Sequence, residues 1–100
     1  MKYIITETQA NKFIRKYLNS LELNVTQNND GSIWVEDNED KPIFHYWIET
    51  AKTYLLIDPH IWGSVRGLFG LDDMSARYEI LLWFEDKFDR RVDDVSIWWD

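Results

Sequence analysis

The chain has 100 residues, no cysteine and a formal net charge of −7, from 18 acidic and 11 basic side chains. The missing cysteines exclude disulfides and thiolate metal sites, and the acidic balance argues against direct binding to nucleic acid. No apolar run is long enough to span a membrane, and the start MKYIIT lacks the features of a signal peptide. We therefore expect a single domain over residues 1–100, without membrane contact and in the cytoplasm.

The first predicted elements are a short strand over Lys2–Ile5 and a helix. Thr6 and Gln9 have the spacing of a capping box, in which each side chain satisfies a free backbone N–H, so the helix is expected to begin there. Apolar residues then recur at helical spacing and predict one buried side. These residues are Ala10, Phe13, Ile14, Tyr17, Leu18 and Leu21.

The apolar pattern changes from helical to alternating after Leu21. Two short alternating segments flank the pair Asp30-Gly31, which is typical of a hairpin turn. Two further turns, at residues 38–41 and 50–52, lead into the segments 43–49 and 53–57. Short connections join antiparallel neighbours, so the sequence predicts a meander of four strands.

Two more helices and a final strand are expected after the meander. Asp58 followed by Pro59 is typical of a helix start, and that helix should run to about Phe69. Asp72 caps a longer helix that extends to about Asp89, and its broad apolar side predicts deep burial. That side consists of Met74, Tyr78, Leu81, Leu82, Trp83, Phe84 and Phe88.

Residues 92–99 alternate again and should add one last strand. The predicted fold class is therefore α+β: an antiparallel meander sheet with three helices packed chiefly on one face. The expected order of elements is β-α-β-β-β-β-α-α-β.

Six tryptophans, five tyrosines and five phenylalanines give the chain more ring surface than a small core readily holds. The segment 43–48 is apolar on both faces, and one register of the sheet places Trp34, Trp47 and Trp98 on the same face. These rings have two interpretations, as core or as a binding surface. We expect a protein-binding surface at Trp34, Trp47, Trp98 and Trp99.

Candidate catalytic and metal-binding groups are few. His45, Asp58 and His60 are the right ligand types for zinc or non-haem iron, but Asp58 is already explained as a helix cap. The acidic run at residues 36–40 lacks the pattern of a calcium loop, and no glycine-rich phosphate loop is present. We accordingly assign no catalytic residue, no metal and no cofactor.

Three stretches of the chain together resemble a group of small uncharacterised bacteriophage proteins. They are the start MKYIITETQ, the segment IWGSVRGLFGLDDMSARYEILLWFEDKF and a closing V-x-x-V strand. The resemblance covers the first ten residues and about residues 61–95. It implies a phage-encoded protein, and it implies no activity and no site residues.

The expected function is a small acidic interaction module that binds another protein, or a second copy of itself, through an aromatic surface. As a phage protein it would be a virion component or an inhibitor of a host protein, located in the virion or in the host cytoplasm. Two alternatives stay open. One is a metal-dependent hydrolase at His45, Asp58 and His60, and the other is an acidic mimic of nucleic acid. The sequence favours a non-enzymatic role.

Overall fold

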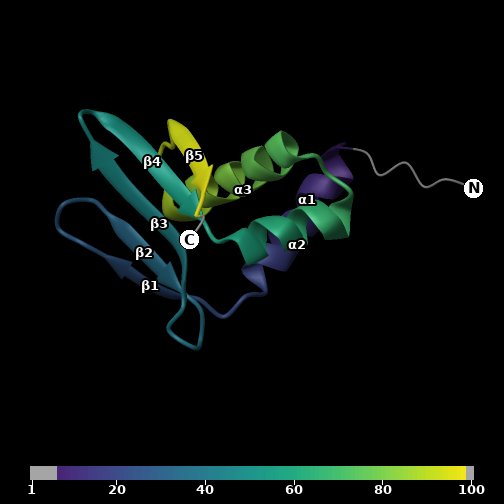
Figure 1. The fold of residues 1–100 in the computed structure, drawn as a ribbon, viewed down its shortest axis with the longest axis horizontal. Helices are drawn as coiled ribbons and strands as arrows, with labels where there is room; N and C mark the ends of the chain where they lie inside the picture. The colour runs from purple at the N-terminus through teal and green to yellow at the C-terminus, as the bar shows by residue number, and fades with distance from the viewer. Residues whose placement is uncertain (1–6, 99–100) are drawn as a thin grey trace, which may run out of the picture.

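The computed structural model describes residues 7–98, and side chains from residue 12 onward. This part of the chain contains three helices and five strands (Figure 1). In chain order they are α1 (Glu7–Asn19), β1 (Asn24–Gln27), β2 (Ile33–Glu36), β3 (Pro42–Glu49), β4 (Lys52–Ile57), α2 (Pro59–Phe69), α3 (Asp73–Phe88) and β5 (Asp94–Ile97). The α+β class is confirmed. The predicted strand at residues 2–5, the Thr6 cap and Trp99 lie outside the described residues.

The five strands form one sheet in the order β1-β2-β3-β4-β5. The meander is confirmed, because each pair from β1 to β4 is antiparallel. The predicted last strand, β5, does extend the sheet, and it pairs with β4 in parallel, a direction that the sequence pattern does not predict. Two helices, α2 and α3, connect β4 to β5 and carry the chain back to the end of the sheet where β4 begins. Parallel neighbouring strands need a crossover connection of this kind.

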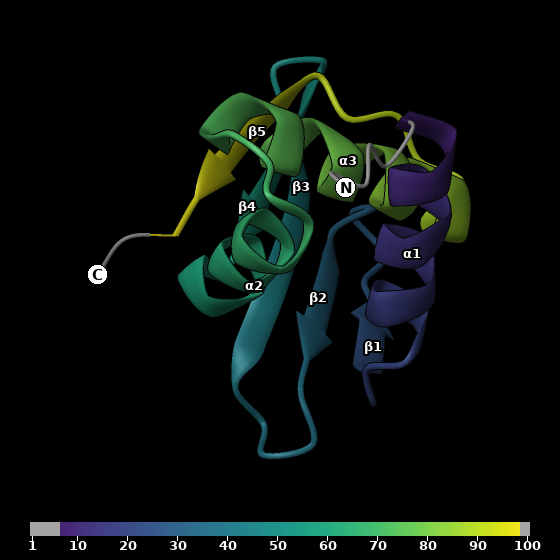
Figure 2. The same ribbon diagram turned by 90° about the vertical axis from the view of Figure 1, so that its right-hand side faces the viewer.

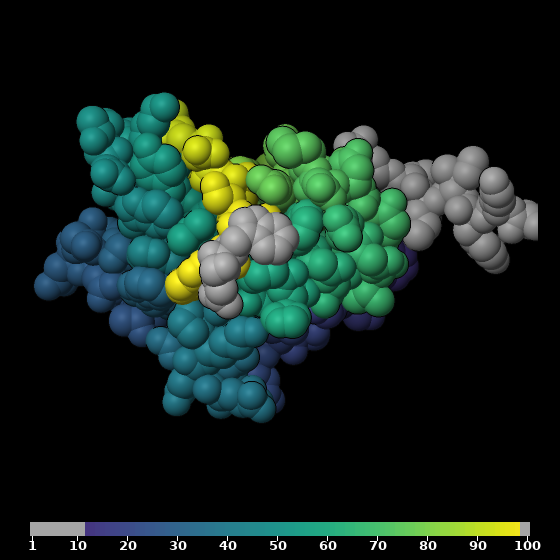
Figure 3. Space-filling view, in the orientation of Figure 1, coloured from purple at the N-terminus to yellow at the C-terminus, as the bar shows by residue number. Residues whose placement is uncertain are grey.

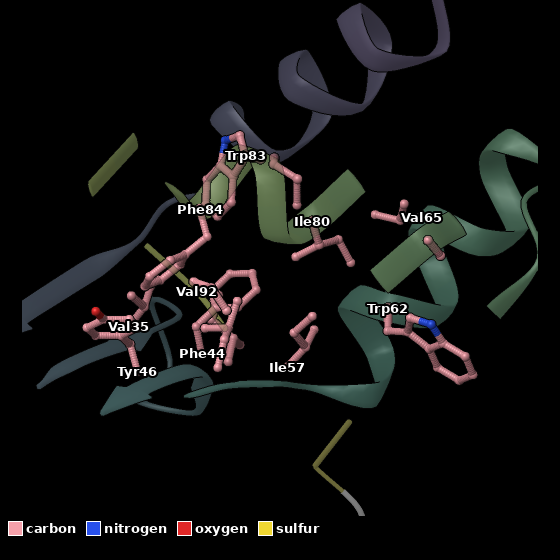
Figure 4. Close-up of a cluster of buried hydrophobic side chains, with 14 of the residues drawn as sticks. Val35, Phe44, Tyr46, Ile57, Trp62, Val65, Ile80, Trp83, Phe84 and Val92 are labelled. Atoms are coloured by element: carbon pink, nitrogen blue, oxygen red, sulfur yellow. The ribbon is translucent and has the colours of Figure 1, made fainter. Parts of the chain in front are cut away.

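All three helices lie on one side of the sheet (Figures 1 and 2). On that side the rings of Phe44 and Tyr46 contact Phe84, at centroid distances of 6.2 and 5.6 Å (Figure 4). In the space-filling view, the β1–β2 and β3–β4 turns project beyond the helices (Figure 3). Because these ring contacts join β3 to α3, the core fills the space between one sheet face and the helices. Its central members are Ile14, Leu18, Ile33, Val35, Leu55, Ile57, Val65 and Ile80.

The buried side of α3 differs from the predicted one. Met74 and Tyr78 are 70% and 57% exposed, although we expected them in the core. Met74 lies two positions before the buried Ala76, and Tyr78 lies two positions before the buried Ile80. Two positions are about 200° apart around a helix, so Met74 and Tyr78 lie on the side opposite the buried residues. The prediction was wrong because it gave weight to large side chains and passed over the small Ala76 that marks the buried stripe. Phe13 of α1 is also exposed.

The predicted starts of α2 and α3 are confirmed by their capping bonds. Asp58 Oδ2 accepts hydrogen bonds from the backbone N–H groups of His60 and Ile61, at 3.0 and 3.2 Å. Asp72 Oδ1 accepts one from the N–H of Ser75 at 2.7 Å. Gly70 ends α2 with a φ of 63°, a left-handed conformation that favours glycine. These local bonds fix where α2 and α3 begin relative to the sheet.

Candidate functional site

The sheet has a second face, opposite the helices, which we call the outer face. Side chains alternate along a strand and cross-strand partners share a face, so the register shows which residues lie there. Trp34 of β2 is the partner of His45 of β3, and Trp47 of β3 is the partner of Tyr54 of β4. Four aromatic or imidazole rings from three neighbouring strands therefore lie together on the outer face.

The rings of the outer face stack on one another. Trp34 and His45 lie nearly parallel with centroids 3.6 Å apart, and His45 and Trp47 follow at 4.9 Å. Trp47 then stacks on Tyr54 at 5.2 Å, and Trp98 tilts against the other end of the series, 6.0 Å from Trp34. We call these five side chains the aromatic row. It crosses the sheet from β2 through β3 to β4, and Trp98, which follows β5, lies against its β2 end.

The described tryptophans fall into two groups by burial. Trp62 and Trp83 are core residues, 7% and 2% exposed. Trp34, Trp47 and Trp98 are only partly buried, and within residues 7–98 no helix covers their face of the sheet (Figures 1 and 2). The expected sharing of one face by these three rings is confirmed. Trp99, the fourth predicted binding residue, lies outside the described residues.

His45 lies between two indoles, which changes its acid–base behaviour. Burial lowers the pKa of the imidazole, because a charged ring loses hydration there, and the nearby Asp30 carboxylate opposes that shift in part. Asp30 Oδ1 itself accepts hydrogen bonds from the N–H and hydroxyl of Ser32, at 2.9 and 2.7 Å, and these lower the Asp30 pKa. At neutral pH His45 therefore contributes an uncharged ring to the row.

The lowered pKa of His45 predicts that acid destabilises the fold. The unfolded chain binds a proton at His45 more readily than the folded chain does. The contribution of the neutral ring to the free energy of unfolding is therefore complete above about pH 6.5 and is lost as the pH falls below that value. Urea unfolding at pH about 7.5 and about 5.5 measures the change, with His45→Gln as the non-titrating control. Equal acid sensitivity of the two proteins would show that His45 does not cause it.

Carboxylates surround the aromatic row. Asp94 of β5 is the register partner of Tyr54, on the side away from Trp47. Alternation places Glu36 and Glu49 on the outer face, where Glu49 is opposite Lys52. Together with Asp30, these groups give the outer face more negative than positive charge. We call Asp30, Glu36, Glu49 and Asp94 the acidic border.

The three candidate metal ligands have separate environments. His45 belongs to the aromatic row, Asp58 caps α2 with its other oxygen 3.5 Å from Lys41 Nζ, and His60 is exposed in the first turn of α2. Within residues 7–98, no three or more His, Asp or Glu side chains are placed to hold a metal ion. The structure thus gives no geometry for the hydrolase alternative.

Two hollows lie beside Asp58. The larger, of about 350 Å³, lies between the segment 20–23 and the start of α2, and the smaller, of about 180 Å³, is bordered by Trp98. Lys41, Asp58 and His60 line both hollows. The Asp58 carboxylate already accepts the capping hydrogen bonds of α2 and pairs with Lys41, so its charge stabilises the start of the helix.

Comparison of the chain with models of protein families, with curated protein sequences and with solved structures finds no match. Across residues 7–98, no helix has both the length and the apolar character that crossing a membrane requires.

Proposed function

We propose that the chain is a protein-binding module and that the aromatic row is the centre of its binding surface. The observation that carries this proposal is the series of four stacked rings, with Trp98 tilted against its end, on a sheet face without a covering helix in the described chain. Tryptophan and tyrosine are the side chains that most often supply binding energy at interfaces. Rings already held by their neighbours lose little further freedom on binding, which favours affinity.

A protein partner suits this surface better than nucleic acid does. Bases bind proteins by stacking on open ring faces, but the inner rings of the row stack on each other instead. The acidic border would also repel phosphate groups. Within this proposal the module has no catalytic function. On the sequence resemblance alone, it is phage-encoded and serves in the virion or as an inhibitor in the host cytoplasm.

The test compares a change in the row with an equal change on the helix side. Trp47→Ser with Tyr54→Ser removes two rings of the row, and Leu68→Ser with Met74→Ser removes two exposed apolar side chains from α2 and α3. Cross-linking and affinity capture, followed by mass spectrometry, identify proteins bound by each variant, and light scattering measures self-association. We expect the row variant to lose its partner and the helix variant to retain it.

Urea unfolding of both variants accompanies the capture experiment, so that loss of binding is not confused with loss of the fold. A folded row variant that captures the same proteins as the natural chain would refute the proposal. Loss of the partner from the helix variant alone would move the binding surface to the helices.

A further inference from the structure

We infer that the aromatic row binds a basic segment of a protein partner, with an arginine or lysine side chain of that segment held between Tyr54 and Asp94. This inference rests on the proposed function and specifies the chemistry of its partner. The observation behind it is the β4 end of the row, where the last ring, Tyr54, has the carboxylate of Asp94 in β5 as its neighbour in the sheet.

The Tyr54 end of the row differs from its interior. Trp47 stacks on one side of Tyr54 with an interplanar angle of 19°, and the next strand on the other side is β5. The residue of β5 in register with Tyr54 is Asp94, which is exposed. A cation placed here would contact a ring face and a carboxylate at once. Cation–π attraction and charge pairing would then act on the same group.

The surrounding charges favour a cationic partner over the other candidates. The acidic border contributes four carboxylates to the outer face, and the whole chain carries a net charge of −7. Two copies meeting through this face would bring these carboxylates together, and nucleic acid would add phosphates to them. A basic segment relieves the same repulsion, so charge complementarity selects it.

The positive groups near the row do not contradict this placement. Lys52 is opposite Glu49 in the register, and Lys41 is paired with Asp58 at 3.5 Å. Lys41 and His60 lie near Trp98, at the far end of the row from Tyr54. His45 is neutral because burial lowers its pKa. Lys52 shares the outer face of β4 with Tyr54, and the two carboxylates Glu49 and Asp94 outnumber it there, so this end keeps an excess of negative charge. We place the cation beside Asp94, which is in register with Tyr54.

The experiment titrates the whole chain with three probes: a short peptide of alternating Arg and Ser, the same peptide with Glu in place of Arg, and single-stranded oligothymidine. Calorimetry gives the affinities, and NMR of the Trp47 indole N–H and the Tyr54 ring locates the binding. We expect the arginine peptide to bind and to shift both signals. We also expect its affinity to fall as salt rises from about 20 to about 200 mM. Tighter binding of the glutamate peptide or the oligonucleotide would overturn the inference.

Two variants test the position of the cation. Asp94→Asn should weaken the arginine peptide about fivefold, which corresponds to about 1 kcal/mol, and Tyr54→Leu should weaken it about tenfold. Glu22→Gln removes an equal charge outside the sheet and should change the affinity less than twofold. Equal losses from Asp94→Asn and Glu22→Gln would show diffuse attraction to the net charge and would overturn the inference.

Two outcomes distinguish failure of this inference from failure of the proposed function. If the arginine peptide does not bind while protein capture still depends on Trp47 and Tyr54, the partner is not basic and the binding surface stands. If capture is indifferent to Trp47 and Tyr54, the binding surface itself is refuted.

Discussion

Replacing Phe84 by alanine is expected to lower the free energy of unfolding by about 3–5 kcal/mol. Phe84 is fully buried in α3, and its ring contacts Phe44 and Tyr46 of β3 and Phe88 of its own helix, 4.6 Å away (Figure 4). Its removal opens a cavity between the sheet and the helices. Domains of this kind are stable by only about 5–15 kcal/mol, so the loss is a large share of the total.

The matched control for Phe84→Ala is Met74→Ala in the same helix. Met74 is 70% exposed, so its truncation should change the free energy of unfolding by less than about 0.5 kcal/mol. Urea unfolding followed by circular dichroism measures both. Similar losses from the two variants would mean that α3 does not face the sheet as described.

Replacing Trp34 by alanine is expected to raise the pKa of His45 towards its ordinary value and to lower the free energy of unfolding by about 2 kcal/mol. Trp34 stacks on one face of the imidazole at 3.6 Å and also supports Trp98. Without the indole, water reaches the imidazole, and its charged form costs less. The loss of stability is smaller than in the core because Trp34 is only partly buried.

An NMR titration of the His45 ring protons measures this pKa, and urea unfolding gives the stability. Trp34→Phe is the control, because a smaller ring that still stacks should keep most of the lowered pKa. An unchanged His45 pKa in Trp34→Ala would show that burial by this indole is not the cause of the shift.

Local signals in the sequence predicted most of the elements. The capping residues Asp58 and Asp72 and the turn residue Gly31 act through bonds and dihedral angles within a few residues, so each could be recognised from the sequence. The direction of β5 could not be predicted this way. It depends on where α2 and α3 return the chain, which tertiary packing decides.

The aromatic row was only partly predictable. Alternation along β3 predicts that His45 shares a face with Trp47, and one register adds Trp34 and Trp98 to that face. The sequence singles out His45 only as a candidate metal ligand, however, and does not single out Tyr54, although both belong to the row. The missing signal was the register between β3 and β4, which brings Tyr54 opposite Trp47. Register is set by the packed core beneath the sheet and by the turn between the strands.

The parallel pairing of β5 also bears on the order in which the protein folds. The pairs from β1 to β4 join neighbours in the chain, whereas the backbone N–H of Thr53 donates a hydrogen bond to the carboxylate of Asp93, 40 residues further on. Closing so long a loop costs more entropy than closing a hairpin. We therefore expect the hairpins to form early in folding, and the edge that brings Asp94 beside Tyr54 to be completed last.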